Sequence, residues 1–170
     1  MSRAPSDERE ARETRPDGDR HSLLRLLVEG SRVLEKRLHE GLRVAGYGDV
    51  RPTHFAVFRY LKPGGSRVTE LAEEAGMTQQ SMGELVDYLE RRGYVERRPD
   101  PHDRRARIVL PTEAGRRGLA VGSEVLVEAE TALAKCMGEG RLEKLVGSLE
   151  ELVTLLVELD PGRVGSAHKR

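Results

Sequence analysis

The sequence contains little cysteine, few aromatic residues and no long apolar run. Cys136 is the only cysteine, which excludes an intramolecular disulfide framework and a cysteine-rich zinc site. Aromatic residues make up 4% of the 170 residues, so a core must be built mainly from aliphatic side chains. No run is long enough to cross a membrane, and the N-terminus lacks the apolar segment of a signal peptide. We therefore expect a soluble, cytoplasmic protein.

Sequence motifs of catalysis and metal binding are absent as well. We find no glycine-rich phosphate loop, no HExxH motif and no nucleophile elbow. His21, His39 and His54 lack the spacing of a zinc site. The sequence therefore predicts a protein that is not an enzyme and that needs no cofactor or metal.

The formal net charge is zero, so the charge of the whole chain does not indicate a nucleic-acid partner. The local charge does, because residues 91–107 contain seven arginines and three acidic residues. The arginines are Arg91, Arg92, Arg97, Arg98, Arg104, Arg105 and Arg107. Such a local excess is typical of a surface that contacts phosphates, although a solvated charged surface has the same composition.

Residues 21–160 are predicted to form one domain between two tails. Residues 1–20 mix both charges with prolines and have almost no apolar side chains, which predicts a disordered tail. Residues 161–170 are predicted to be a flexible tail. Within the domain, residues 50–111 form a compact lobe, and residues 21–46 and 112–160 form long helices.

The lobe has the element order of a winged helix-turn-helix. After a helix over 52–62, two short helices are predicted over 69–75 and 79–92, with Gly76 ending the first and Thr78 capping the second. Strand-like runs follow at 94–97 and 107–110 around a proline-containing tip. The predicted fold class is therefore mainly α with a small two-stranded β wing.

The helix over 79–92 supplies candidates for contact with DNA bases, because the first residues of such a helix lie nearest the major groove. Glutamine can pair with adenine, and serine can contact a base or a phosphate. A carboxylate repels phosphate, so Glu84 fits only if it accepts from a cytosine amino group or orients an arginine. Alternatively, Gln80 and Glu84 belong to a solvated helix face. The candidates are Thr78, Gln79, Gln80, Ser81, Gly83 and Glu84.

The tip of the wing supplies candidates for the minor groove and the phosphates. Planar guanidinium groups suit the narrow, negative minor groove, and we assign this role to Arg105. Asp103, two residues earlier, is expected to hold the Arg105 guanidinium in place. Arg104 and Arg107 are expected to contact phosphates. The alternative for Asp103, and for Asp100, is an Asx-type turn beside Pro101.

Two stretches of this sequence resemble the MarR family of bacterial transcription regulators. DPHDRRARIVLPTEAG is similar to the wing of that family, and TELAEEAGMTQQSMGELVDYLERRGYVER is similar to its helix-turn-helix. The resemblance covers roughly residues 21–159. It implies a winged-helix homodimer on a palindromic operator, with Asp103 orienting Arg105 in the minor groove. Two departures are Gly83-Glu84, where Ser-Arg is common in the family, and Arg51, where Thr is common.

Leucines on the first and last helices support dimerisation independently of this resemblance. Six leucines from Leu142 to Leu159 recur at spacings of three and four, as in a heptad seam, and a stripe runs from Leu23 to Leu42. Both exceed what a small lobe must cover. Pairing them across a two-fold axis would bury them, whereas the alternative is packing within one subunit.

The resemblance also implies a small aromatic or phenolic effector in a crevice between the dimer helices and the lobe. Tyr47, His54, Phe55 and Phe58 fall in the corresponding region. Aromatic residues at helical spacing more often belong to an ordinary core, which is the alternative interpretation. Cys136 is interpreted as a small hydrophobic residue rather than a redox sensor.

We therefore predict a homodimeric, sequence-specific DNA-binding regulator, namely a repressor that a small molecule releases from a palindromic operator. Two alternatives belong to other functional classes. One is a winged helix that binds another protein, and the other is a ligand- or redox-sensing protein that does not read DNA.

Overall fold

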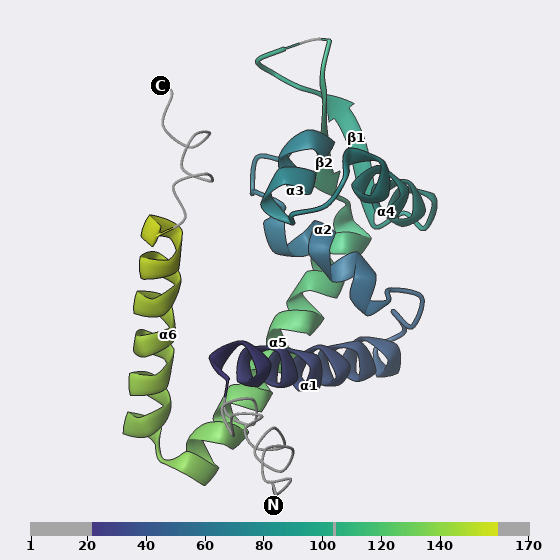
Figure 1. The fold of residues 1–170 in the computed structure, drawn as a ribbon. Helices are drawn as coiled ribbons and strands as arrows, with labels where there is room; N and C mark the ends of the chain where they lie inside the picture. The colour runs from purple at the N-terminus through teal and green to yellow at the C-terminus, as the bar shows by residue number, and fades with distance from the viewer. Residues whose placement is uncertain (1–21, 104, 160–170) are drawn as a thin grey trace, which may run out of the picture.

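The computed structural model describes residues 22–103 and 105–159, so Arg104 and the two predicted tails lie outside the described residues. The fold is mainly helical with one two-stranded antiparallel sheet, which confirms the predicted class. The elements are α1 (Leu23–Val44), the 3-10 helix η3 (Pro52–His54), α2 (Phe55–Tyr60), α3 (Val68–Glu74), α4 (Gln79–Arg91), β1 (Val95–Pro99), β2 (Arg107–Pro111), α5 (Glu113–Met137) and α6 (Glu139–Leu159). Figure 1 shows a compact lobe of α2, α3, α4 and the hairpin, from which α5 runs across α1 towards α6.

Local signals in the sequence place most helix ends. The Thr78 hydroxyl accepts from the Ser81 N–H at 3.1 Å, and the Thr112 hydroxyl accepts from the Gly115 N–H at the same distance. Gly76 has φ +63°, the left-handed conformation that ends α3. The predictions for Thr78 and Gly76 are confirmed.

One predicted helix differs in the structure. The helix expected over 52–62 is divided into the short 3-10 turn and α2, which ends at Tyr60. Arg51 precedes this turn and makes no capping contact through its side chain, and the His54 side chain accepts the Arg51 N–H instead. Near the C-terminus, Gly138 alone breaks the chain direction, with φ +90°, whereas Gly140 lies inside α6.

A single apolar core holds the lobe together. The predicted stripe of α4 is buried, and it packs against α2, α3 and both strands. Each large apolar side chain that is buried contributes about 1.5–3 kcal/mol. The core therefore fixes α4 relative to the hairpin. Its fully buried members are Val57, Leu71, Ala72, Met82, Val86, Leu89, Val95 and Val109.

The segment before α3 is joined to the hairpin. The Ser66 N–H donates to the Val109 carbonyl at 3.2 Å, and the Val109 N–H donates to the Ser66 carbonyl at 2.8 Å. Gly65 has φ +89° and lies close to the Val109 carbonyl, where a side chain would be strained and crowded. Ser66 thus extends the two-stranded sheet by one bridge at the start of α3.

The start of α5 is fixed against the beginning of the hairpin. The Thr112 N–H donates to the Tyr94 carbonyl at 3.0 Å, and the Thr112 hydroxyl donates to the Gly93 carbonyl at 2.6 Å. Gly115 is buried against the Tyr94 carbonyl, and a Cβ atom there would overlap that oxygen. The long helix α5 therefore begins in direct contact with the lobe.

The apolar faces of the terminal helices remain largely uncovered within one chain. No residue in the range Glu139–Leu159 is buried, and Leu42 alone is buried in α1. Within the described ranges, no helix is both long enough and apolar enough to cross a membrane. Exposed large apolar residues of α1 and α6 include Leu23, Leu24, Leu26, Leu27, Val33, Leu145, Val146, Val153, Leu155, Leu156 and Leu159.

Candidate nucleic-acid interface and adjoining cavity

The structure brings the predicted α4 candidates together on one surface of the lobe. Thr78, Gln79, Gln80, Ser81 and Glu84 are exposed at the start of the helix. Gly83 is half-buried, and a Cβ atom at this position would meet open space.

Two hydrogen bonds organise the polar side chains of this surface. Thr78 Oγ1 donates to Ser81 Oγ at 2.9 Å, and Gln80 Nε2 donates to Glu84 Oε1 at 3.3 Å. The first pair, Thr78 and Ser81, presents hydroxyl groups to solvent, and the second pair, Gln80 and Glu84, presents an amide and a carboxylate.

Arg97 neutralises the other acidic residues on the side of α4 that faces β1. The Arg97 guanidinium lies 2.6 Å from Asp87 Oδ1 and also pairs with Glu90. The backbone N–H of Arg97 donates to Glu90 Oε1 at 3.1 Å. Arg97 is thus part of the lobe's internal structure rather than a free basic group. From the sequence, Arg97 is counted among seven arginines that contact phosphates, and its pairing with the carboxylates of α4 is not predicted.

Two further arginines of this group pair with carboxylates. Arg98 Nη2 lies 2.6 Å from Glu96 Oε1, and Arg92 Nε lies 3.5 Å from Asp49 Oδ2. Arg105 and Arg107 have exposed side chains on the wing, and Arg104 lies outside the described residues. The positive charge that the wing presents to solvent is therefore smaller than the arginine count indicates.

The tip of the wing is closed by backbone hydrogen bonds and two Asx-type contacts. Asp100 Oδ1 accepts the His102 N–H at 2.8 Å, and Asp103 Oδ1 accepts the Arg105 N–H at 3.0 Å. Across the tip, the Asp100 N–H donates to the Ala106 carbonyl at 3.0 Å. Asp103 therefore contacts the backbone of Arg105, as in the alternative interpretation, rather than its guanidinium.

Arg67 is a residue of this surface that the sequence interpretation missed. It immediately precedes α3, and its Nε donates to Asp100 Oδ2 at 2.7 Å while its Nη2 lies 2.6 Å from the same oxygen. The His102 N–H and the Arg67 guanidinium hold the pKa of the Asp100 carboxyl below its ordinary range. The two partners are 33 residues apart in sequence, and no local pattern links them.

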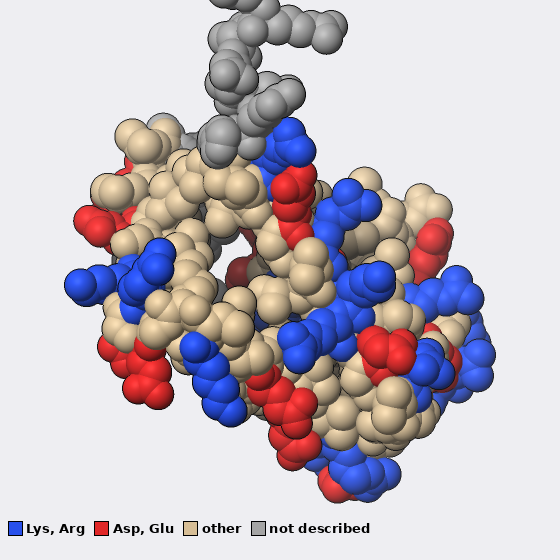
Figure 2. Space-filling view, turned by 90° about the horizontal axis from the view of Figure 1, so that it is seen from below, with Lys and Arg blue, Asp and Glu red and all other residues tan. Residues whose placement is uncertain are grey.

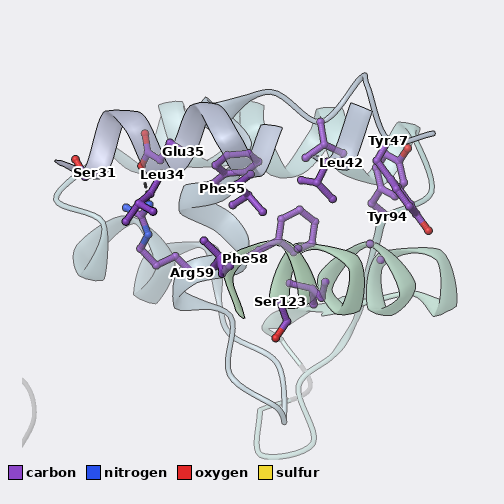
Figure 3. A pocket seen from close by; sticks show the side chains of 17 residues that line it. Ser31, Leu34, Glu35, Leu42, Tyr47, Phe55, Phe58, Arg59, Tyr94 and Ser123 are labelled. Carbon is purple, nitrogen blue, oxygen red and sulfur yellow. Dashed lines mark hydrogen bonds and ion pairs between the residues drawn. The ribbon is translucent and has the colours of Figure 1, made fainter. Parts of the chain in front are cut away.

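A cavity of about 500 Å³ lies between the lobe and the long helices. Figure 3 shows Glu35 and Arg59 at one end, Tyr47 and Tyr94 at the other, and the two phenylalanines between them. The lining is mostly apolar. It includes Leu34, Leu38 and Leu42 of α1, Phe55 and Phe58 of α2, and Gly118, Leu119, Gly122 and Leu126 of α5.

Three of the four predicted effector residues line this cavity, and His54 does not. His54 is 5% exposed, and its ring stacks on Tyr88 of α4 with a centroid distance of 4.4 Å. Its Nδ1 accepts the Arg51 N–H at 3.0 Å. Burial lowers the pKa of His54, so this side chain is a neutral part of the packing.

The polar groups of the cavity are connected to the helices around them. Arg59 Nη2 lies 2.8 Å from Glu35 Oε1, which joins α2 to α1. The Tyr94 hydroxyl donates to Asp49 Oδ1 at 2.7 Å, and burial together with this bond raises the pKa of Tyr94 to about 12. The Tyr88 hydroxyl donates to the Asp49 carbonyl at 3.1 Å, which links the cavity wall to α4.

Cys136 is exposed near the end of α5 and forms no disulfide. In the part of the chain that the structure describes, no group of three His, Cys, Asp or Glu side chains is arranged to hold a metal ion. The cavity and the α4–wing surface are therefore the features with a chemical rationale for binding.

Comparisons with known proteins match both the sequence and the fold. A sequence model of the MarR family matches residues 49–106, which span the lobe. The chain is 33% identical over 111 residues to the transcriptional regulator HosA of Escherichia coli O111:H-, covering 64% of this chain and 76% of HosA. It is 30% identical over 89 residues to YcgE of Bacillus subtilis, an uncharacterized HTH-type transcriptional regulator. That match covers 52% of this chain and 58% of YcgE, less than two thirds of its length.

Solved structures share the fold. The transcriptional repressor CouR bound to a 23-mer DNA duplex has a TM-score of 0.64 and 24% identity, covering 83% of this chain and 99% of that chain. CouR from Rhodococcus jostii RHA1 bound to p-coumaroyl-CoA has a TM-score of 0.57 and 23% identity, covering 85% of this chain and 93% of that chain. These similarities confirm the winged-helix fold.

The burial of His54 makes the stability of the fold depend on pH. Because the pKa of His54 is lower in the folded state than its ordinary value of 6.5, the folded state binds fewer protons than the unfolded state. The contribution of this residue to the free energy of unfolding should be complete above about pH 6.5 and should decrease as the pH falls below it. In His54→Gln this part of the decrease should disappear.

Urea unfolding between pH 7 and pH 5 measures the effect. His102→Gln is the matched control, because His102 is exposed on the wing and its removal should leave the pH dependence unchanged. Equal pH dependence in His54→Gln and the wild type would contradict the assignment.

Proposed function

The chain belongs to the MarR family of transcriptional regulators, and from this premise we propose that it binds a palindromic operator as a homodimer and is released by a small aromatic molecule. The observation that carries the proposal is the position of two surfaces on one rigid lobe. The exposed start of α4 and the wing share the same apolar core. A helix and a hairpin fixed in this way can contact two neighbouring grooves of one duplex.

In the proposed complex, α4 reads the major groove and the wing follows the adjacent minor groove. Gln80 can form a bidentate pair with adenine, and Ser81 can contact a base or a phosphate. Arg105 suits the minor groove and Arg107 a phosphate. CouR, a protein with this fold, has been solved bound to a 23-mer DNA duplex, which supports DNA binding as the function of such a lobe.

Glu84 gives the proposed reading surface a distinctive chemistry. Asp87 and Glu90 are paired with Arg97, whereas Glu84 accepts a hydrogen bond from the neutral amide of Gln80. An exposed carboxylate repels phosphates and accepts hydrogen bonds from the amino group of cytosine. We therefore propose that the Gln80–Glu84 pair restricts the bases that α4 accepts rather than adding affinity.

Dimerisation is proposed because, among the residues that the structure describes, no element covers the apolar faces of the terminal helices. Figure 2, which shows the molecule from below, has an uncharged area around a central hollow, with charged side chains around it and across the right of the view. Leucines and valines of α1 and α6 are exposed in the single chain. A second copy would bury both sets across a two-fold axis and set two α4 helices about 34 Å apart, one helical turn of DNA.

The cavity is the proposed effector site. Its volume of about 500 Å³ falls within the range of small-molecule pockets, and it lies between the proposed dimer helices and the lobe. Tyr47, Phe55 and Phe58 offer aromatic faces to a planar ligand. The complex of CouR with p-coumaroyl-CoA supports a small-molecule role for proteins of this fold.

Replacing the wing arginine tests DNA binding. Arg105→Ala should weaken operator binding about 5- to 150-fold, because an arginine in a groove contributes about 1–3 kcal/mol. The dimer should remain intact in sedimentation, since Arg105 lies on the wing and not on the terminal helices. Arg98→Ala removes an equal charge that is paired with Glu96 and should have a much smaller effect. If Arg105→Ala binds the operator as well as the wild type does, the wing assignment is wrong.

Replacing the major-groove glutamine tests base reading. Gln80→Ala should bind a wider set of sequences, because the amide that distinguishes adenine is removed while the phosphate contacts remain. Selection of binding sites from a random duplex library measures this preference. Glu128→Ala, an exposed change on α5, is the control and should select the same sites as the wild type. An unchanged consensus for Gln80→Ala would show that α4 does not read bases through this residue.

Replacing a cavity aromatic tests the effector site. An aromatic compound that releases the operator should bind Phe58→Leu several-fold to about tenfold more weakly, because the stacking face is lost while most of the apolar volume remains. Isothermal titration measures this affinity. Tyr60→Leu, an aromatic change on the same helix but away from the cavity lining, should leave the affinity unchanged. Equal losses in both variants would place the ligand elsewhere.

A further inference from the structure

We propose that Arg67 is a positioning residue that fixes the tip of the wing and thereby the approach of Arg105 to DNA. The inference rests on the proposed DNA binding and deepens it. Arg67 precedes α3, the first helix of the helix-turn-helix, whereas Asp100 belongs to the wing. Their ion pair therefore joins the part of the lobe that carries α4 to the part that carries Arg105.

The pair is tight and partly sheltered from solvent. Two nitrogens of Arg67 lie within 2.7 Å of one Asp100 oxygen, and Arg67 Nη2 also lies 3.6 Å from Asp103 Oδ2. The Asp100 side chain is 9% exposed, against 36% for Arg67. A carboxylate that is mostly buried needs a partner, because an unpaired charge in such a place is strongly destabilising. Asp100 is thus held at the point where Arg67 can reach it.

Hydrogen bonds pass this constraint from Asp100 to Arg105. The Asp103 N–H donates to the Asp100 carbonyl at 3.3 Å, and the Ala106 N–H donates to the Asp103 carbonyl at 2.9 Å. Asp103 Oδ1 then accepts the N–H of Arg105 at 3.0 Å. Both carboxylates near Arg67 therefore hold a backbone N–H of the tip. Asp100 holds that of His102, and Asp103 holds that of Arg105.

Arg67 is well anchored to exert this constraint. Its own N–H donates to Glu70 Oε2 at 3.1 Å, which fixes its backbone to the first turn of α3. The preceding residue, Ser66, pairs with Val109 of β2. The guanidinium thus extends from a backbone held on two sides, and the tip is fixed relative to the helix-turn-helix rather than only to itself.

A fixed tip matters for recognition because a mobile arginine loses conformational freedom when it enters the minor groove. When the backbone that carries the arginine is already ordered, that loss of freedom is smaller and weakens binding less. Without Arg67, Arg105 should lose most of its ability to distinguish a narrow A·T-rich minor groove from a wider G·C-rich one. The contacts of α4 should remain.

The test combines Arg67→Ala and Arg105→Ala, singly and together, with two operators that differ only in A·T or G·C pairs beneath the wings. The wild type should prefer the A·T flanks about fivefold or more, and Arg67→Ala should reduce this ratio to less than about twofold. Arg105→Ala should have little further effect once Arg67 is absent, because interacting residues are not additive. Arg98→Ala, which removes a wing charge without touching Asp100, should keep the flank preference.

Hydrogen exchange of the free protein provides a readout that does not depend on DNA. Arg67→Ala should raise the exchange rates of the His102, Arg105 and Ala106 amides by a larger factor than those of the lobe core, which report only the overall loss of stability. Arg67→Lys, which keeps the charge but not the guanidinium, should give an intermediate result.

Retention of both the flank preference and the full Arg105 effect in Arg67→Ala would overturn the proposal. A second result would also overturn it: in Arg67→Ala, the slope of log affinity against log salt concentration falls by about one phosphate contact while the flank preference is unchanged. Arg67 would then contact DNA directly. Failure of the wild type to bind any duplex would overturn the proposed function instead. In that case the exchange rates decide separately whether Arg67 fixes the tip.

Discussion

The apolar core shared by α2, α3, α4 and the β-hairpin is the constraint on which the rest of this structure depends. Val86 and Leu89 of α4 and Val109 of β2 are completely buried in it, and Val95 of β1 is 1% exposed. A helix and a hairpin that pack into one core cannot turn independently, because each turn would expose apolar surface to water. The grooves of a duplex have a fixed spacing, so in the proposed complex this shared core would let the helix and the hairpin act as one recognition surface.

Ion pairs within the lobe refine the geometry that the core establishes. Arg97 joins β1 to the carboxylates of α4, and Arg67 joins the start of α3 to the tip of the wing. These two arginines are paired with carboxylates inside the lobe, whereas Arg105 and Arg107 are exposed on the wing. The lobe therefore uses part of its positive charge for its own structure, and the proposed contact with DNA depends on the smaller part that is exposed on the wing.

Much of the fold could be predicted from the sequence, because its signals are local. The hydroxyls of Thr78 and Thr112 each accept the backbone N–H three residues later and so cap a helix. Gly76 adopts the left-handed conformation that often ends a helix. The stripe of α4 follows from the helical period. Candidate residues on α4 were found for the same reason, since a helix displays its polar face wherever its apolar face is buried.

The contacts that could not be predicted are those between distant segments. Nothing in the residues around Arg67 indicates that Asp100 lies beside it, or that Ser66 pairs with Val109. His54 fits the helical spacing of the cavity aromatics, yet its ring stacks on Tyr88 of α4. Asp103 has two available partners in Arg105, the guanidinium and the backbone N–H, and tertiary geometry selects the second.

The most direct test of the central claim, that two copies of one rigid lobe read DNA together, is the binding of the full chain to paired half-sites of varied spacing. Titration followed by light scattering gives both affinity and stoichiometry. We expect two chains per duplex, with the tightest binding when half-site centres lie about 10 base pairs apart and much weaker binding when about five base pairs are inserted. The claim would be contradicted if the affinity were the same with and without the inverted repeat, and at every half-site spacing, at all salt concentrations.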